Sequence, residues 1–126
     1  MRKTEIEEIV QARLQDAEVL FESSRYDGSV YLCGYAVELG LKARICRTLQ
    51  WDEYPTSGKY STFKTHDLDV LLHLTGLEDK VKLQYMAEWS IAAQWNPEAR
   101  YKPIGSVKEA DAKEMLASAK ELIKQL

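Results

Sequence analysis

The chain has two histidines, and one of them, His66, lies where a helix is predicted to begin. Thr65 is a suitable N-cap residue, so His66 is expected in the first turn of that helix. Unpaired backbone amides and the positive end of the helix dipole favour an anion such as phosphate there. A neutral imidazole at this position could act as a general base toward a ribose hydroxyl or as a hydrogen-bond donor. The alternative is that it ties the preceding loop to the helix.

An arginine and aromatic residues stand together in the run WNPEARY, which begins at Trp95 and ends at Tyr101. Arg100 can bind a phosphate through two parallel N–H groups, and Tyr101 or Trp95 could stack on a base. The alternative is that Trp95 and Tyr101 only cover the end of a helical bundle.

Glu38 stands four residues before Lys42 in a predicted helix, which is the favourable order for an ion pair on one helix face. A solvated or structural pair is expected. Gly34 and Gly40 in the same helix each cost about 1 kcal/mol relative to alanine, so something should compensate. Close approach of a neighbouring helix would do so, and a ligand lying on bare backbone is the other interpretation.

Cations gather from the end of this helix through the loop that follows it: Lys42, Arg44, Arg47, Lys59 and Lys64. Asp52 and Glu53 interrupt the set, which favours a solvated face over a track for a phosphate backbone. Lys64 and Asp67 flank the Thr65–His66 pair and are counted with the candidate ligand-binding residues. His66, Asp67 and His73 lack a fourth donor for a metal, so neither a metal nor a cofactor is expected.

Apolar residues at helical spacing and no strand pattern predict an all-α fold, an antiparallel bundle of four to five helices. The whole chain, residues 1–126, is expected to form one domain. Capping boxes are predicted at Thr4 with Glu7 and at Ser106 with Glu109. The expected helices are Thr4 to about Ser23, a second after the polar stretch Ser23–Gly28 to about Leu49, Thr65 to about Gly76, Val81–Ala93, and Ser106–Leu126; the long connectors are Gln50–Lys64 and Trp95–Gly105.

The net charge of -3 gives the chain no global positive field, so any contact with RNA must be local. Cys33 and Cys46 fall in one predicted helix, roughly 20 Å apart, which excludes a disulfide between them. No apolar run approaches the roughly 20 residues of a membrane span. These features predict a cytoplasmic protein with reduced thiols.

Three segments carry a resemblance to a known family: SSRYDGSVYLCGYAVELGLKARI from Ser23, THDL from Thr65, and WNPEARY from Trp95. Together they resemble the HEPN domain, a small α-helical family associated with RNA cleavage, nucleotide binding and nucleotidyltransferase partners. The resemblance implies a homodimer, and it implies that Glu38, His66, Arg100 and Tyr101 line a shared cleft. A dimer is also expected because the helix that ends near Leu49 has more apolar surface than one partner layer would cover.

Ribonuclease members of that family carry an arginine followed, after four to six residues, by a histidine. The three positions at this spacing before His66 hold Ser61, Tyr60 and Lys59, and none is arginine. Lys59 has the charge but lacks the planar fork that an arginine offers a phosphate. The positions before His73 hold Leu68, Asp67 and His66, so neither histidine completes the motif.

The sequence therefore predicts a non-catalytic or weakly catalytic module associated with nucleotides or single-stranded RNA. The resemblance implies a nucleotidyltransferase-type partner in a toxin–antitoxin or defence pairing. One alternative is a metal-independent ribonuclease toxin with His66 as base and Lys59 or Arg100 stabilising the phosphate. Another is a purely structural protein-interaction domain.

Overall fold

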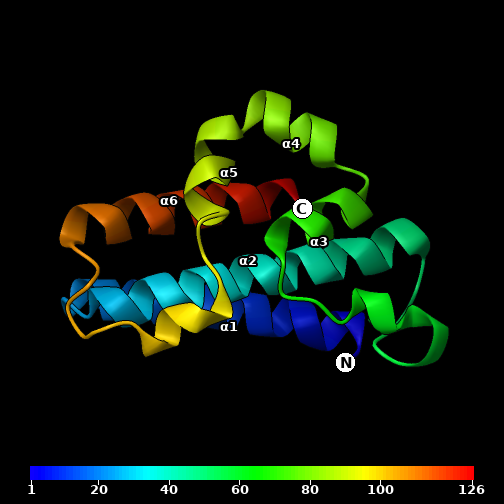
Figure 1. Ribbon diagram of the computed structural model, residues 1–126, viewed down its shortest axis with the longest axis horizontal. Coiled ribbons are helices and arrows are strands. Elements are labelled where there is room, and N and C mark those ends of the chain that lie inside the picture. Colours follow the sequence, from blue (N-terminus) through cyan, green and yellow to red (C-terminus); the bar gives the residue numbers. More distant parts are fainter.

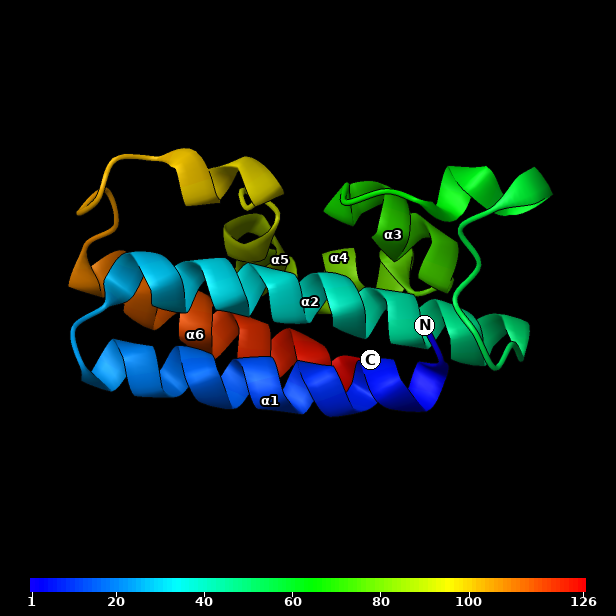
Figure 2. The ribbon, with the colours of Figure 1, turned by 90° about the horizontal axis from the view of Figure 1, so that it is seen from below.

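Three long helices form the body of the protein in a computed structural model that describes residues 1–126: α1 (Lys3–Glu22), α2 (Tyr26–Leu49) and α6 (Glu109–Gln125). The helix α1 runs antiparallel to α2, and α6 runs in the same direction as α2 (Figure 1). Figure 2 shows α1 on one side of α2 and the shorter segments on the other. The predicted all-α helical bundle is confirmed.

The shorter elements carry the chain back from the end of α2 to the start of α6, which is why these two helices are parallel. They are η1 (Gly58–Phe63), α3 (Leu68–Thr75), α4 (Glu78–Gln84), α5 (Met86–Ala92) and η2 (Pro97–Tyr101). The single helix predicted over Val81–Ala93 is two helices, because the backbone of Tyr85 leaves helical geometry at φ -131° and ψ 33°. Both long connectors contain a short 3₁₀ helix, η1 or η2.

Neither predicted capping box forms. The helix α1 starts at Lys3, one residue before Thr4, and Lys3 donates its backbone N–H to the carbonyl of Asp52. At the other end of the chain, α6 starts at Glu109, after Lys108. The hydroxyl of Ser106 instead donates to the carbonyl of Pro103 within the connector.

The break between α1 and α2 is shorter than the predicted Ser23–Gly28, since α2 already begins at Tyr26. Ser24 turns the chain with a positive φ of 60°. The buried hydroxyl of Ser29 then donates to the carbonyl of Ala17 at 2.7 Å, which joins the two helices just after the turn.

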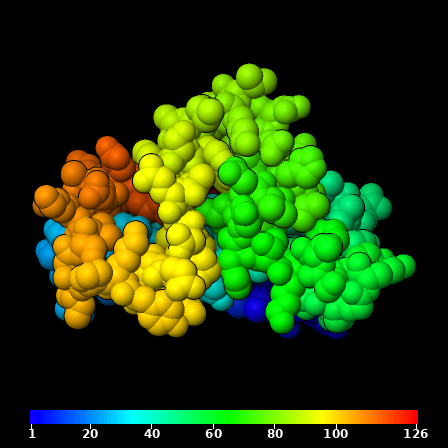
Figure 3. Space-filling model, in the orientation of Figure 1, coloured from blue at the N-terminus to red at the C-terminus, as the bar shows by residue number.

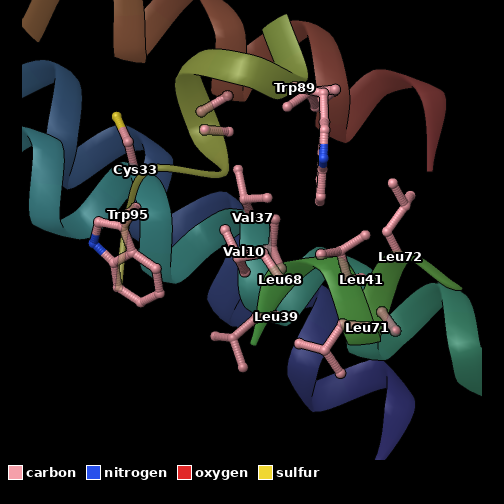
Figure 4. Packing of buried hydrophobic residues seen from close by; sticks show 14 of the residues in the cluster. Val10, Cys33, Val37, Leu39, Leu41, Leu68, Leu71, Leu72, Trp89 and Trp95 are labelled. Atoms are coloured by element: carbon pink, nitrogen blue, oxygen red, sulfur yellow. The ribbon is translucent and has the colours of Figure 1, made fainter. Parts of the chain in front are cut away.

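The helix α2 lies at the centre of the core and contacts α1, α3, α6 and η2. Val37, Leu41 and Ile45 are fully buried on it, and Figure 4 shows Val37 and Leu41 facing Leu68, Leu71 and Leu72 of α3. The rest of the chain covers most of the apolar surface of α2, which leaves little of it for a second copy. Cys33 and Cys46 both lie buried on α2 as free cysteines.

Gly34 and Gly40 of α2 are both explained by close approach. A β-carbon at Gly34 would lie 2.2 Å from the ring of Trp95, so this ring packs directly on the helix backbone. At Gly40 the neighbours are the side chains of Leu126 and Ile123 at 3.2 and 3.5 Å. A neighbouring helix thus accounts for Gly40, and an indole from the second long connector accounts for Gly34.

None of the helices combines the length and the apolar character needed to cross a bilayer.

Candidate functional site

His66 does not lie in the first turn of a helix, contrary to the sequence-based expectation. It precedes Asp67, which is the N-cap residue of α3 and accepts hydrogen bonds from the backbone N–H groups of Asp69 at 3.0 Å and Val70 at 3.3 Å. Thr65 supports the turn by accepting from the N–H of Asp67 at 3.1 Å. A carboxylate therefore already occupies the amide end of α3, and Asp67 acts there as a cap rather than as a free ligand group.

The side chain of His66 reaches back to α2 and meets Glu38. Its Nδ1 lies 3.0 Å from each carboxylate oxygen of Glu38, and Nζ of Lys42 lies 3.0 Å from one of them. Glu38 is only 2% exposed, whereas 64% of the His66 side chain is exposed. The predicted pair of Glu38 and Lys42 is thus present, and it is buried rather than solvated.

This arrangement fixes what the imidazole can do. An ionised carboxylate only accepts hydrogen bonds, so Nδ1 of His66 must carry the proton that it donates to Glu38. In the neutral ring, Nε2 is then an acceptor at the molecular surface. It can take a proton from a hydroxyl group or, when the ring is protonated, donate a hydrogen bond to a phosphate.

The two candidate lysines lie on the long connector before α3. Nζ of Lys59 lies 5.2 Å above the ring of Tyr60, its neighbour on η1, and Lys64 follows η1 as an exposed residue. Packing among four aromatic rings orders the connector: Trp51, Tyr54, Tyr60 and Phe63. Lys59 therefore adjoins an aromatic ring, and the structure records no bond from it to His66.

Tyr54 is a member of this site that sequence reasoning missed. It is buried, its hydroxyl donates to the carbonyl of Phe63, and Nζ of Lys42 lies 5.3 Å from its ring. Burial raises the pKa of Tyr54 far above its ordinary value, so the hydroxyl stays protonated. A tyrosine within a polar loop carries no pattern that predicts burial, which is why the sequence did not identify it.

Arg100 and Tyr101 lie together at the other end of α2. The guanidinium of Arg100 lies 5.0 Å above the ring of Tyr101, and one of its nitrogens is 3.5 Å from the hydroxyl of Tyr31. Asn96 caps η2 by accepting from the N–H of Glu98 at 2.9 Å, which sets the position of Arg100 one turn later. Both Arg100 and Tyr101 are exposed.

The four residues that were expected to line one shared cleft lie at two separate places along α2. Arg100 lines a pocket of about 540 Å³, but Glu38, His66 and Tyr101 are not among its lining residues. Tyr31, the contact of Arg100 on α2, precedes Glu38 by seven residues, or about 10 Å of helix. Figure 3 shows that the segment before α3 and the segment around η2 occupy the same face of the molecule. A ligand that touches both places must therefore be extended.

Asp27 is a second residue that sequence reasoning missed. Its carboxylate accepts from the backbone N–H groups of Gly105 at 2.6 Å and Val107 at 2.9 Å, and so ties the connector before α6 to the first turn of α2. These two hydrogen bonds, the stronger from Gly105, hold the pKa of Asp27 below its usual range. From sequence, an acidic residue in a first helical turn looks like an ordinary partner of the helix dipole.

Comparison with known proteins assigns the family. The model of the HEPN domain matches residues 8–126, which is nearly the whole chain. No curated protein and no solved structure matches it. The match agrees with the all-α helical bundle. The chain therefore belongs to the HEPN domain family, which associates it in general terms with nucleotides or RNA.

Proposed function

We propose that this domain is a non-catalytic or weakly catalytic module that binds a nucleotide or single-stranded RNA on the face that carries Glu38 and His66. The observation that supports this most is the exposed imidazole of His66, oriented by a buried carboxylate through Nδ1. An oriented donor or acceptor loses little conformational freedom on binding. Lys64 and Lys59 on the adjacent connector add positive charge for a phosphate backbone.

The lack of strong catalysis follows from the cations around His66. A transition state for phosphoryl transfer needs a cation aimed at the phosphate oxygens, and the arginine of the family's ribonuclease motif is absent. Lys42 is already paired with Glu38, and Lys59 lies over Tyr60. The second candidate, a metal-independent ribonuclease with His66 as base, is favoured by one observation: Glu38 holds Nδ1 of a side chain that is 64% exposed, which leaves Nε2 for a substrate.

The domain is proposed to act in the cytoplasm as a homodimer beside a nucleotidyltransferase-type protein, in a toxin–antitoxin or defence pairing. Leu83 and Met86, at the junction of α4 and α5, are 84% and 55% exposed and offer an apolar contact for a second copy. Sedimentation equilibrium should give twice the chain mass of 14.5 kDa, and Leu83→Glu with Met86→Glu should return the monomer. A monomeric parent protein would contradict the dimer.

Titration of a fluorescent single-stranded RNA and of ATP tests the binding role, with RNA integrity followed in the same samples. His66→Ala should weaken RNA binding by about tenfold, because a hydrogen bond to a charged group is lost. The matched control is His73→Ala, which removes an exposed histidine whose Nδ1 lies 3.6 Å from Glu78 on the α3–α4 side. Equal binding by both variants would contradict the assignment of His66.

RNA cleavage in the same samples would distinguish the ribonuclease from the binding module. Cleavage by the parent protein that is lost in His66→Ala but kept in His73→Ala would establish the ribonuclease. Intact RNA with measurable binding supports the module. Neither binding nor cleavage would contradict both and leave a protein partner as the ligand, as in a purely structural domain.

A further inference from the structure

The start of the chain pairs with the long connector that leads to His66, and Figure 1 shows the two side by side. Lys3 donates its backbone N–H to the carbonyl of Asp52 at 2.8 Å. Tyr54 donates its backbone N–H to the carbonyl of Met1 at 3.0 Å. The residues between these two bonds form an antiparallel β-bridge. Two main-chain hydrogen bonds therefore fix one point of a segment that contains no α-helix.

The fixed point is also the only place where packing holds the connector. Between Cys46 and Leu68, Tyr54 is the only buried residue. None of the residues of η1 is buried, and 64% of the His66 side chain is exposed. The position of the connector beside His66 therefore depends on Tyr54 and on the bonds that hold its backbone.

The side chain of Tyr54 connects this point to the turn before His66. Its hydroxyl donates to the carbonyl of Phe63. The same carbonyl accepts the backbone N–H of Thr65 at 2.9 Å. Met1 thus holds the backbone of Tyr54, and the side chain of Tyr54 holds the turn that ends one residue before His66.

A second connection runs from Tyr54 to His66 through α2. Nζ of Lys42 lies 5.3 Å from the centre of the Tyr54 ring and 3.0 Å from a carboxylate oxygen of Glu38. Glu38 in turn lies 3.0 Å from Nδ1 of His66. A displacement of Tyr54 therefore moves a partner of Glu38 as well as the backbone that leads to His66.

We propose that residues 1–3 position the imidazole of His66 by pairing with the connector, and that Tyr54 links the two. The inference rests on the proposed function only in taking single-stranded RNA as the ligand of His66. Releasing the pairing should leave the helical bundle folded, free the imidazole from Glu38 and weaken RNA binding.

Lys3→Pro tests the pairing with little effect on the helix. Lys3 is the first residue of α1, where proline is tolerated because the N–H of that position has no partner within the helix. Arg2 already has the extended backbone, φ -71° and ψ 147°, that a residue before proline adopts. The substitution therefore removes the bond to Asp52. Lys3→Ala is the matched control, because it loses the same side chain and keeps the N–H.

Nitrogen NMR of the histidine side chains shows which ring nitrogen of His66 carries the proton, without any RNA present. At about pH 8.5, where histidine side chains are neutral, the parent and Lys3→Ala should keep the proton on Nδ1. Lys3→Pro should show a mixture of the two tautomers, while His73 stays unchanged. In RNA titrations Lys3→Pro should bind about fivefold more weakly than Lys3→Ala, because the imidazole is no longer held in place before binding.

Tyr54→Phe tests the link separately, because it removes the hydroxyl that holds Phe63 and keeps the buried ring. It should give the same mixture of His66 tautomers as Lys3→Pro. The control is Tyr60→Phe, which removes a hydroxyl from a ring that packs on Phe63 at 6.2 Å and should leave His66 as in the parent. Circular dichroism of each variant should show the helical content of the parent.

Two outcomes would overturn the proposal: a His66 tautomer in Lys3→Pro identical to that in Lys3→Ala, or a parent-like tautomer in a folded Tyr54→Phe variant. A tautomer that changes in both variants while RNA affinity stays constant would support the positioning of His66. That result would contradict the proposed role of His66 in binding RNA, so the two proposals fail separately.

Discussion

His66 and Glu38, 28 residues apart in the sequence, form a pair in which the imidazole faces solvent and the carboxylate is buried. The pair joins the connector before α3 to the middle of α2. Glu38 also binds Lys42, so one buried carboxylate holds two basic groups. The position of the exposed imidazole is therefore set by a group that solvent hardly reaches.

Replacing Glu38 with glutamine should destabilise the fold by about 1–3 kcal/mol, because Lys42 loses its counter-charge in a partly buried place. Urea unfolding measures the change. His66→Ala is the comparison and should cost less than about 0.5 kcal/mol, since the imidazole is mostly exposed and Glu38 keeps Lys42. A Glu38→Gln variant as stable as the parent would show that the carboxylate charge does not hold this site together.

Gly34→Ala should be less stable than Gly40→Ala by about 1–3 kcal/mol. Both variants gain the same helix propensity, so their difference isolates the contact made by the new β-carbon. At Gly34 that carbon would meet the rigid ring of Trp95 at 2.2 Å, whereas at Gly40 it meets the mobile end of Leu126 at 3.2 Å. Thermal unfolding of the two variants provides the comparison, and equal midpoints would mean that Trp95 does not pack on Gly34.

The hydrogen bonds from Gly105 and Val107 to Asp27 should make stability depend on pH in the acid range. Because the pKa of Asp27 is lowered in the folded protein, the carboxylate stabilises the fold above its ordinary pKa of about 3.9, and this stabilisation is lost as the pH falls through the lower folded value. The parent should therefore unfold at a higher temperature than Asp27→Asn at about pH 6, and the gap should narrow toward about pH 3. A difference in unfolding temperature between the two proteins that does not change with pH would contradict the stabilising role of the ionised Asp27 carboxylate.

The helical bundle could be predicted from the sequence because apolar residues recur at helical spacing in every long segment. The helix ends could not, and His66 shows why. Thr65 and Asp67 are both good N-cap residues, and in the structure Asp67 caps α3 while Leu68, the next residue, is buried in the core. A shift of two residues takes His66 out of the helix and lets it reach Glu38.

One contact among the candidate site residues could be anticipated from the sequence, but their grouping could not. Glu38 and His66 were placed together by resemblance, and the structure brings them into contact. Arg100 was placed with them, yet it meets Tyr31 two turns earlier on α2. Which turn of a helix a connector reaches depends on long-range packing, here that of Trp95 on Gly34, and no local pattern encodes it.

The most direct test of the account follows the imidazole signals of the two histidines by NMR while single-stranded RNA is added. With only His66 and His73 in the chain, His73→Ala assigns both signals, and His73 serves as the internal control. The account predicts that the His66 signal shifts in a saturable way, that the His73 signal stays in place and that the RNA remains intact. Saturable RNA binding that leaves the His66 signal unmoved would contradict it.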